Sequence, residues 1–129
     1  GHLRMFSDEA LGHVQGHVDV LYIDGAHRYG PALADIRSWG DRVADGGTML
    51  IHDSFSSIGV TAAIVRSLVP GSRFRYVGRS RSMTIYRADL AAGPGARLGN
   101  AARQIKVMLS LGYGRLMTRF GRPVPEWPY

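Results

Sequence analysis

Two apolar runs, separated by a segment with helical spacing, mark the first half of the chain. Residues Val18–Ile23 are almost entirely apolar, which is typical of a parallel strand buried on both faces. Residues 28–43 carry apolar side chains at helical spacing, Pro31 suits the first turn, and Gly46-Gly47 ends the segment. Residues 48–51 form the second run. The pattern predicts a strand, a crossover helix and a second parallel strand.

Further elements are predicted on both sides of this unit, from capping residues, apolar spacing and turn signals. They are a short helix over 7–11 capped by Ser7, a helix over 60–68 that stops at Pro70-Gly71, and strands over 74–77 and 83–86 joined by a hairpin turn at 78–81.

The C-terminal part is predicted to form a linker at 91–95, a basic amphipathic helix and an extended proline-rich tail over 122–129. We expect the apolar face of this helix to dock on the body of the protein or on a second subunit, with contact to a membrane surface as the alternative. Gly112 and Gly114 weaken the helix. The face consists of Leu98, Ala102, Ile105, Leu109 and Leu116.

Composition narrows the class of protein. A chain of 129 residues is enough for one modest domain. It has no cysteine, which excludes disulfides, cysteine-ligated zinc and thiol nucleophiles and is compatible with a cytoplasmic location. No apolar run is long enough to span a membrane.

The net charge of +6 is unevenly distributed. Residues 1–65 carry four Lys or Arg and eight acids, whereas residues 66–129 carry twelve and two. A basic half can bind nucleic acid or an anionic surface. Since no aromatic-rich binding signature accompanies it, a solvated face explains the charge better than a nucleic-acid site.

Chemistry-bearing side chains follow both predicted strands. Asp24-Gly25 ends the first strand, His27 lies three residues beyond Asp24, and His52-Asp53 ends the second. Because neighbouring parallel strands bring their tips within about 5 Å, Asp24 and Asp53 are predicted to share a divalent cation. His27 can accept a proton near neutral pH. In the alternatives, Asp24 caps the next helix, Asp53 caps a turn, and His52 is a buried, satisfied side chain.

The chain contains an ordered set of short motifs at helix-length spacing. The motifs are Ile23-Asp24-Gly25-Ala26-His27-Arg28-Tyr29, Asp35, Trp39, Gly46-Gly47, His52-Asp53-Ser54 and Gly59-Val60. Together they resemble the later half of class I S-adenosylmethionine-dependent methyltransferases, within the branch of small-molecule O-methyltransferases, and the resemblance covers roughly residues 5–87.

The resemblance implies roles for individual residues. Asp24 matches a strand-end aspartate that binds a divalent ion such as Mg²⁺ near the methyl group, and Asp53 matches a second ligand, with His52 or Ser54 beside it. His27 falls where relatives place a catalytic base, with Asp24 also in the catalytic set. Asp24 and Gly25 are expected to contact S-adenosylmethionine, and Ser7 falls, as a poorer match, where a loop approaches the adenine.

The same resemblance implies an α/β, partial Rossmann-like methyltransferase fold. It would have two parallel strands with a crossover helix, a C-terminal antiparallel hairpin, and no counterpart of the first three strands of the usual sheet. Residues 1–90 would form the later half of the domain, and 91–129 the linker, helix and tail. The family's glycine-rich cofactor loop and ribose-binding acid are absent from the sequence. We therefore expect weak or no cofactor binding by this chain alone.

An apolar strand edge is seldom left bare. We expect the edge of Val18–Ile23 to be covered by the C-terminal helix, by a second copy in a homo-oligomer, or by another chain that supplies the missing half. The expected activity is methyl transfer to a small-molecule hydroxyl. The alternatives are a non-enzymatic interaction module that uses the basic half, and another doubly wound enzyme with a metal at the same strand ends.

Overall fold

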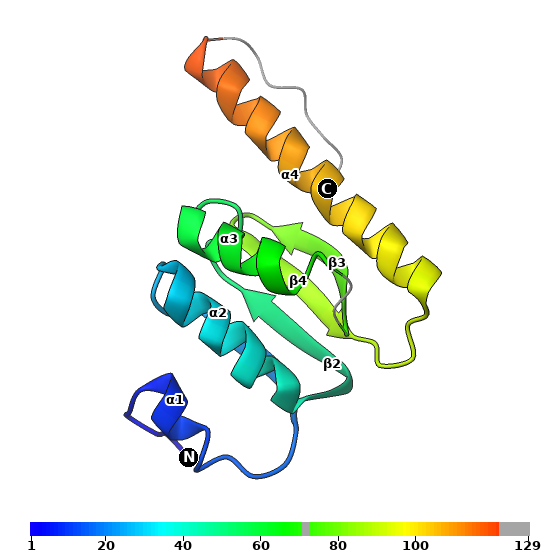
Figure 1. Cartoon of the computed structure of the whole chain (residues 1–129). Coiled ribbons are helices and arrows are strands. Elements are labelled where there is room, and N and C mark those ends of the chain that lie inside the picture. Colours follow the sequence, from blue (N-terminus) through cyan, green and yellow to red (C-terminus); the bar gives the residue numbers. More distant parts are fainter. Residues whose placement is uncertain (71–72, 122–129) are drawn as a thin grey trace.

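A four-stranded mixed sheet forms the centre of the computed structural model (Figure 1), which describes residues 1–70 and 73–121. The strand order is β1-β2-β4-β3. Strands β1 (Val18–Ile23) and β2 (Val43–Ile51) are parallel, whereas β4 (Met83–Ala88) is antiparallel to β2 and to β3 (Phe74–Ser80). The predicted α/β class, with a parallel pair followed by an antiparallel hairpin, is confirmed. The arrangement is consistent with a partial Rossmann-like fold.

Helices α2 (Tyr29–Ser38) and α3 (Ile58–Ser67) lie side by side against one face of the sheet (Figure 1). Their apolar faces, which include Ile36 and Ile64, pack against Met49 and Ile51 of β2. Helix α2 is the crossover connection between the two parallel strands, as the spacing of apolar residues predicts. This packing fixes the tips of both strands beside the N-terminal ends of the two helices.

The second strand begins earlier than predicted. Helix α2 ends at Ser38, a single 3₁₀ turn covers Gly40–Arg42, and β2 starts at Val43, which the apolar spacing had assigned to the helix. Val18 pairs with Val43 but Val20 pairs with Thr48, so the strand bulges between them, and Gly46 there has a φ of 75°. The glycine pair thus belongs to an irregular strand and does not end a helix.

The hairpin strands are also longer than predicted. Gly78 lies within β3, at a shift of register between Tyr76 and Gly78, and the turn is formed by Arg81 and Ser82. Arg81 has a φ of 52°, in the left-handed region that tight turns require. As in β2, a glycine that predicts a turn from sequence marks a bulge in the strand.

Helix α4 (Pro94–Arg119) docks through a different face from the one predicted. The Asn100 side chain accepts a hydrogen bond from the Tyr76 backbone N–H (2.7 Å) and donates one to the Phe74 carbonyl (3.0 Å). Gln104 accepts from the Tyr86 hydroxyl (3.1 Å) and is fully buried. Of the five apolar side chains predicted to dock, the four large ones remain exposed: Leu98, Ile105, Leu109 and Leu116.

The expectation that this helix covers the edge of β1 is therefore wrong. The helix lies beside β3, at the opposite edge of the sheet, because the Asn100 amide satisfies the backbone groups that the outer edge of β3 presents. Within the described residues β1 pairs with β2 alone. Val20 is 62% exposed and Tyr22 is 52% exposed, so the prediction that this strand is buried on both faces is wrong for the described residues.

Two predictions remain, one on membrane spans and one on segments that lie outside the described residues. Among the described helices, none has the length and apolar character needed to cross a membrane. The predicted proline-rich tail over 122–129 lies outside the described residues, as does Gly71 of the predicted helix stop.

Candidate active site

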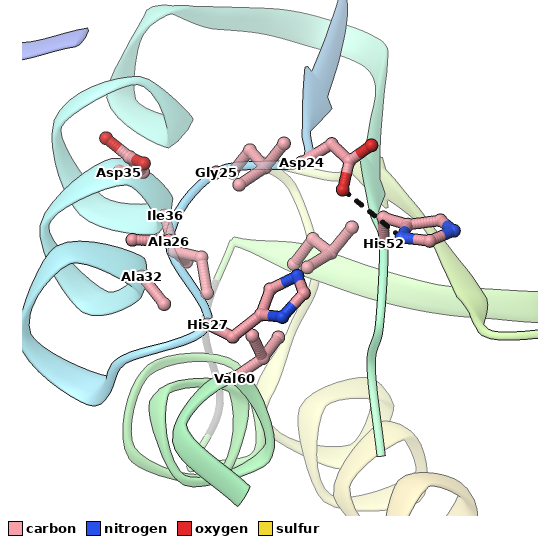
Figure 2. A pocket seen from close by; sticks show the side chains of 11 residues that line it. Asp24, Gly25, Ala26, His27, Ala32, Asp35, Ile36, His52 and Val60 are labelled. Carbon is pink, nitrogen blue, oxygen red and sulfur yellow. Dashed lines mark ion pairs between the residues drawn. The ribbon is translucent and has the colours of Figure 1, made fainter. Parts of the chain in front are cut away.

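The tips of β1 and β2 lie side by side, as predicted. The His52 backbone N–H donates to the Ile23 carbonyl (2.9 Å), so the residues that follow both strands emerge together. Asp24 Oδ1 lies 3.2 Å from His52 Nδ1 (Figure 2). The predicted proximity of the two strand-end motifs is confirmed.

A second histidine–carboxylate pair extends this contact. His27 Nε2 lies 3.0 Å from Asp53 Oδ2, and the same oxygen is 3.6 Å from His52 Nδ1. The four residues Asp24, His52, Asp53 and His27 thus form one continuous cluster, which we call the strand-tip cluster. It brings together two loops that are distant in sequence, β1–α2 and β2–α3.

The backbone that carries Asp53 adopts an uncommon conformation. Asp53 has a φ of 49° and Phe55 a φ of 61°, both in the left-handed region. Aspartate tolerates this region because its short side chain hydrogen-bonds locally, whereas a phenylalanine is strained there. Phe55 is buried, and this packing holds the strained loop. Strain of this kind concentrates at functional sites.

Asp53 also organises the turn that follows it. Its carbonyl accepts hydrogen bonds from the Ser56 and Ser57 backbone N–H groups, and its Oδ1 accepts one from the Ser56 hydroxyl (3.2 Å). The turn-capping alternative for Asp53 is therefore correct, but it does not exclude a role in the site. The Oδ1 atom of Asp53 accepts the hydrogen bond within the turn, and its Oδ2 atom faces His27.

Helix α3 positions the loop that carries His27. The Ser57 hydroxyl donates to the His27 carbonyl (3.1 Å). Gly59 packs directly on the same loop, where a Cβ atom would overlap the His27 carbonyl oxygen and lie 2.8 Å from the Tyr29 nitrogen. A residue at position 59 must therefore lack a side chain for α3 to approach this loop.

Asp24 is held by a tyrosine of its own strand. The Tyr22 hydroxyl donates to Asp24 Oδ2 (3.1 Å). Desolvation, together with this hydrogen bond, raises the pKa of Tyr22, so the phenol remains a donor at neutral pH. Arg28, and not Asp24, occupies the N-cap of α2. The helix-capping alternative for Asp24 is therefore wrong.

His52 and His27 differ in the exposure of their rings and in the partners of their ring nitrogens. His52 Nε2 lies 3.2 Å from the Ser82 hydroxyl, and its Nδ1, which is buried, makes no hydrogen bond within the described residues although Asp24 is near. The His27 side chain is 56% exposed, and its Nε2 faces Asp53. Its Nδ1 makes no hydrogen bond within residues 1–70 and 73–121. His27 thus has a ring nitrogen available to a ligand, with the other nitrogen oriented by a carboxylate.

A small pocket adjoins the cluster. Asp24, Gly25, His27 and His52 line it, together with apolar side chains of α2 and α3 (Figure 2). Its cavity volume is about 10 Å³, which is room for about one water molecule. Within the described residues, this pocket is therefore too small to enclose a ligand much larger than water.

Asp35 of α2 also lines this pocket, although it is not among the site residues that the sequence predicts. The Ser7 hydroxyl donates to Asp35 Oδ1 (2.6 Å), and the Trp39 indole N–H donates to the Ser7 carbonyl (3.1 Å). Ser7 is the first residue of α1 (Ser7–Ala10), whose N-cap is Phe6, so Ser7 does not cap this helix. It contacts Asp35 but is not among the residues that line the pocket. Only the family motif in which Asp35 stands could have indicated it.

The predicted metal ligands do not assemble as a set. Within the described residues, no group of three or more His, Asp or Glu side chains is arranged to hold a metal ion. Asp24, His52 and Asp53 are instead engaged in the histidine–carboxylate contacts of the strand-tip cluster.

Comparison with known protein families gives a match to the N-terminal part of the chain. Residues 2–54 match the model of a family described as a methyltransferase domain. The matched segment runs through β1, α2 and β2 and ends just after Asp53. The comparison with curated proteins gave no match. The match supports a methyltransferase domain in this part of the chain.

Proposed function

We propose that this chain takes part in S-adenosylmethionine-dependent transfer of a methyl group to the hydroxyl of a small molecule, with the strand-tip cluster as the acceptor side of the site. One observation carries the proposal. The segment that matches a methyltransferase domain ends on the two strand tips that bring Asp24, His27, His52 and Asp53 together.

His27 is the proposed catalytic base. An acceptor hydroxyl must lose its proton as its oxygen bonds to the methyl carbon, and a positioned base removes that proton. His27 Nδ1 takes it, while Asp53, 3.0 Å from Nε2, orients the ring and stabilises the imidazolium. Asp24 is proposed to orient the bound ligands from the neighbouring strand tip. S-adenosylmethionine, when bound, supplies a methyl group that is already activated, so alignment and proton removal are what the protein adds.

The cofactor does not fit within the described pocket, whose volume is about 10 Å³. We therefore propose that further strands pair with the open edge of β1 and supply the rest of the cofactor site. The exposed Val20 and Tyr22 on β1 would be buried by them. Gly25 and Ser7 remain predicted contacts to the cofactor in that completed site.

A divalent cation bound by Asp24, His52 and Asp53 also remains a prediction. The donor set as arranged lacks three converging ligands. The proton transfer to His27 is accordingly independent of a metal in this proposal.

Calorimetric titration of the chain with S-adenosylmethionine tests the proposal. We expect weak but saturable binding, with a dissociation constant of about millimolar order, because one wall of the site is present. Asp24→Ala should abolish it, whereas Asp41→Ala, in the 3₁₀ turn Gly40–Arg42, should not. Equal saturable binding by both variants would contradict the proposal.

A further inference from the structure

Helix α4 carries an apolar stripe that nothing in the described part of the chain covers. Successive residues of a helix are about 100° apart, so the side chains of this stripe fall within an arc of about 80° and extend along about 33 Å of the helix. Figure 1 shows the C-terminal half of α4 extending past the sheet. The stripe consists of Leu98, Ala102, Ile105, Leu109, Tyr113, Leu116 and Phe120.

The stripe lies roughly opposite the face that docks on the body. Asn100 and Gln104 are buried against β3 and β4, and Val107, Met108 and Leu111 are packed against the core. Leu98, Leu109 and Phe120 are 74%, 69% and 70% exposed. A partner can therefore cover the stripe without displacing α4 from the sheet.

The helix also needs such a partner for its own stability. From residue 112 to residue 119 no side chain is buried, so the body does not stabilise this part. Gly112 and Gly114 lie there, and a glycine inside a helix is about 1 kcal/mol less favourable than alanine. A helix with these properties is stabilised mainly by the packing of its apolar face.

Charge identifies the partner. Helix α4 contains five cations and no acidic residue. On the helical projection Lys106 and Arg119 flank the stripe on either side, and Arg97, Arg103 and Arg115 lie further round. Pairing two copies through the stripe would bring cations against cations. An anionic lipid surface instead accepts the apolar side chains into its acyl boundary and the long basic side chains among its headgroups.

We propose that the exposed stripe of α4 binds the surface of membranes that contain anionic lipid, with the helix axis lying in the plane of the interface. The sheet and the strand-tip cluster then stay on the aqueous side, because the docked face of α4 points away from the lipid. The catalytic proposal does not depend on this binding.

Flotation with lipid vesicles tests the inference. We expect the chain to bind vesicles of phosphatidylcholine mixed with phosphatidylserine and to bind pure phosphatidylcholine at least tenfold more weakly. Rising salt should release it, because anionic surfaces are screened. Lys106→Glu should weaken binding more than about fivefold, since each cation near such a surface contributes about that factor.

A matched pair of variants tests the stripe itself. Leu109→Asp combined with Leu116→Asp should abolish vesicle binding, whereas Ile58→Asp, which places the same charge on another fully exposed position (91%), should weaken it less than the paired change does. Equal vesicle binding by the two proteins would overturn the inference. It would also be overturned if light scattering showed that the stripe holds two copies together and the unmodified chain left anionic vesicles unbound.

Discussion

The His27 ring and the Asp53 carboxylate meet at 3.0 Å from two loops that follow different strands. The β1–α2 loop supplies the histidine, and the left-handed turn after β2 supplies the aspartate. A histidine oriented in this way by a carboxylate is suited to accept a proton from a hydroxyl.

Replacement of His27 should separate catalysis from stability. His27→Gln is expected to slow the formation of S-adenosylhomocysteine from a hydroxylated acceptor by about 10²-fold or more, the usual contribution of a positioned base. Because the side chain is exposed, the free energy of unfolding should change by less than about 0.5 kcal/mol. His13→Gln, on an exposed position, is the control, and equal rates for the two variants would argue against the assignment.

Replacement of Gly59 should disturb the loop that carries His27. Gly59→Ala forces a Cβ atom into the backbone at His27 and Tyr29, and we expect a loss of about 1–3 kcal/mol in the free energy of unfolding in urea. Gly99→Ala is the matched control, because a Cβ there meets open space within a helix and should stabilise by up to about 1 kcal/mol. Similar unfolding curves for both variants would show that the close approach is not required.

Asn100 should account for the attachment of α4 to the sheet. Asn100→Asp keeps an acceptor for the Tyr76 N–H but loses the donor to the Phe74 carbonyl. Loss of this hydrogen bond, together with burial of a carboxylate in place of the amide, should destabilise the variant by about 1–3 kcal/mol. Hydrogen exchange measured by NMR should become faster at residues of α4 and β3. Unchanged exchange in β3 would contradict the role assigned to Asn100.

The buried tyrosines predict a pH dependence of stability. Burial raises the pKa of Tyr86 and of Tyr76 above the ordinary value of 10.0. The folded protein thus holds the two phenol protons more tightly than the unfolded chain does. The resulting contribution to the free energy of unfolding is fully present below about pH 10 and is lost as the pH rises above it. Urea unfolding across this range should show the decline. Tyr86→Phe should reduce it, with Tyr113→Phe as the control for removal of one tyrosine.

The sequence predicts the strand-tip geometry but not every boundary around it. Strand β1 is recognisable because its run of apolar side chains is typical of a parallel strand, although Val20 and Tyr22 are exposed, and the parallel order then brings Asp24 beside His52. In the sequence, Gly46 predicts the end of a segment and Gly78 a turn, yet both lie at bulges inside strands, because a glycine accommodates either conformation.

The pairing of His27 with Asp53 depends on a left-handed turn at Asp53 and Phe55, and these two residue types do not predict such a turn from sequence.

The sequence does not predict how α4 docks on the sheet, for a related reason. The Asn100 amide bonds to backbone groups at the edge of β3, and the Gln104 amide bonds to the Tyr86 hydroxyl and the Leu68 carbonyl, whereas an apolar pattern identifies only apolar contacts. Polar docking of this kind is visible only once the strand edge is in place.

Chemical-shift mapping of the chain with S-adenosylmethionine tests most directly whether the strand tips form a methyl-transfer site. In amide NMR spectra, we expect saturable shifts at residues 24–27 and 52–54 that are reversed by competition with S-adenosylhomocysteine. Shifts confined to other parts of the chain, or none at these two tips at saturating ligand, would contradict it.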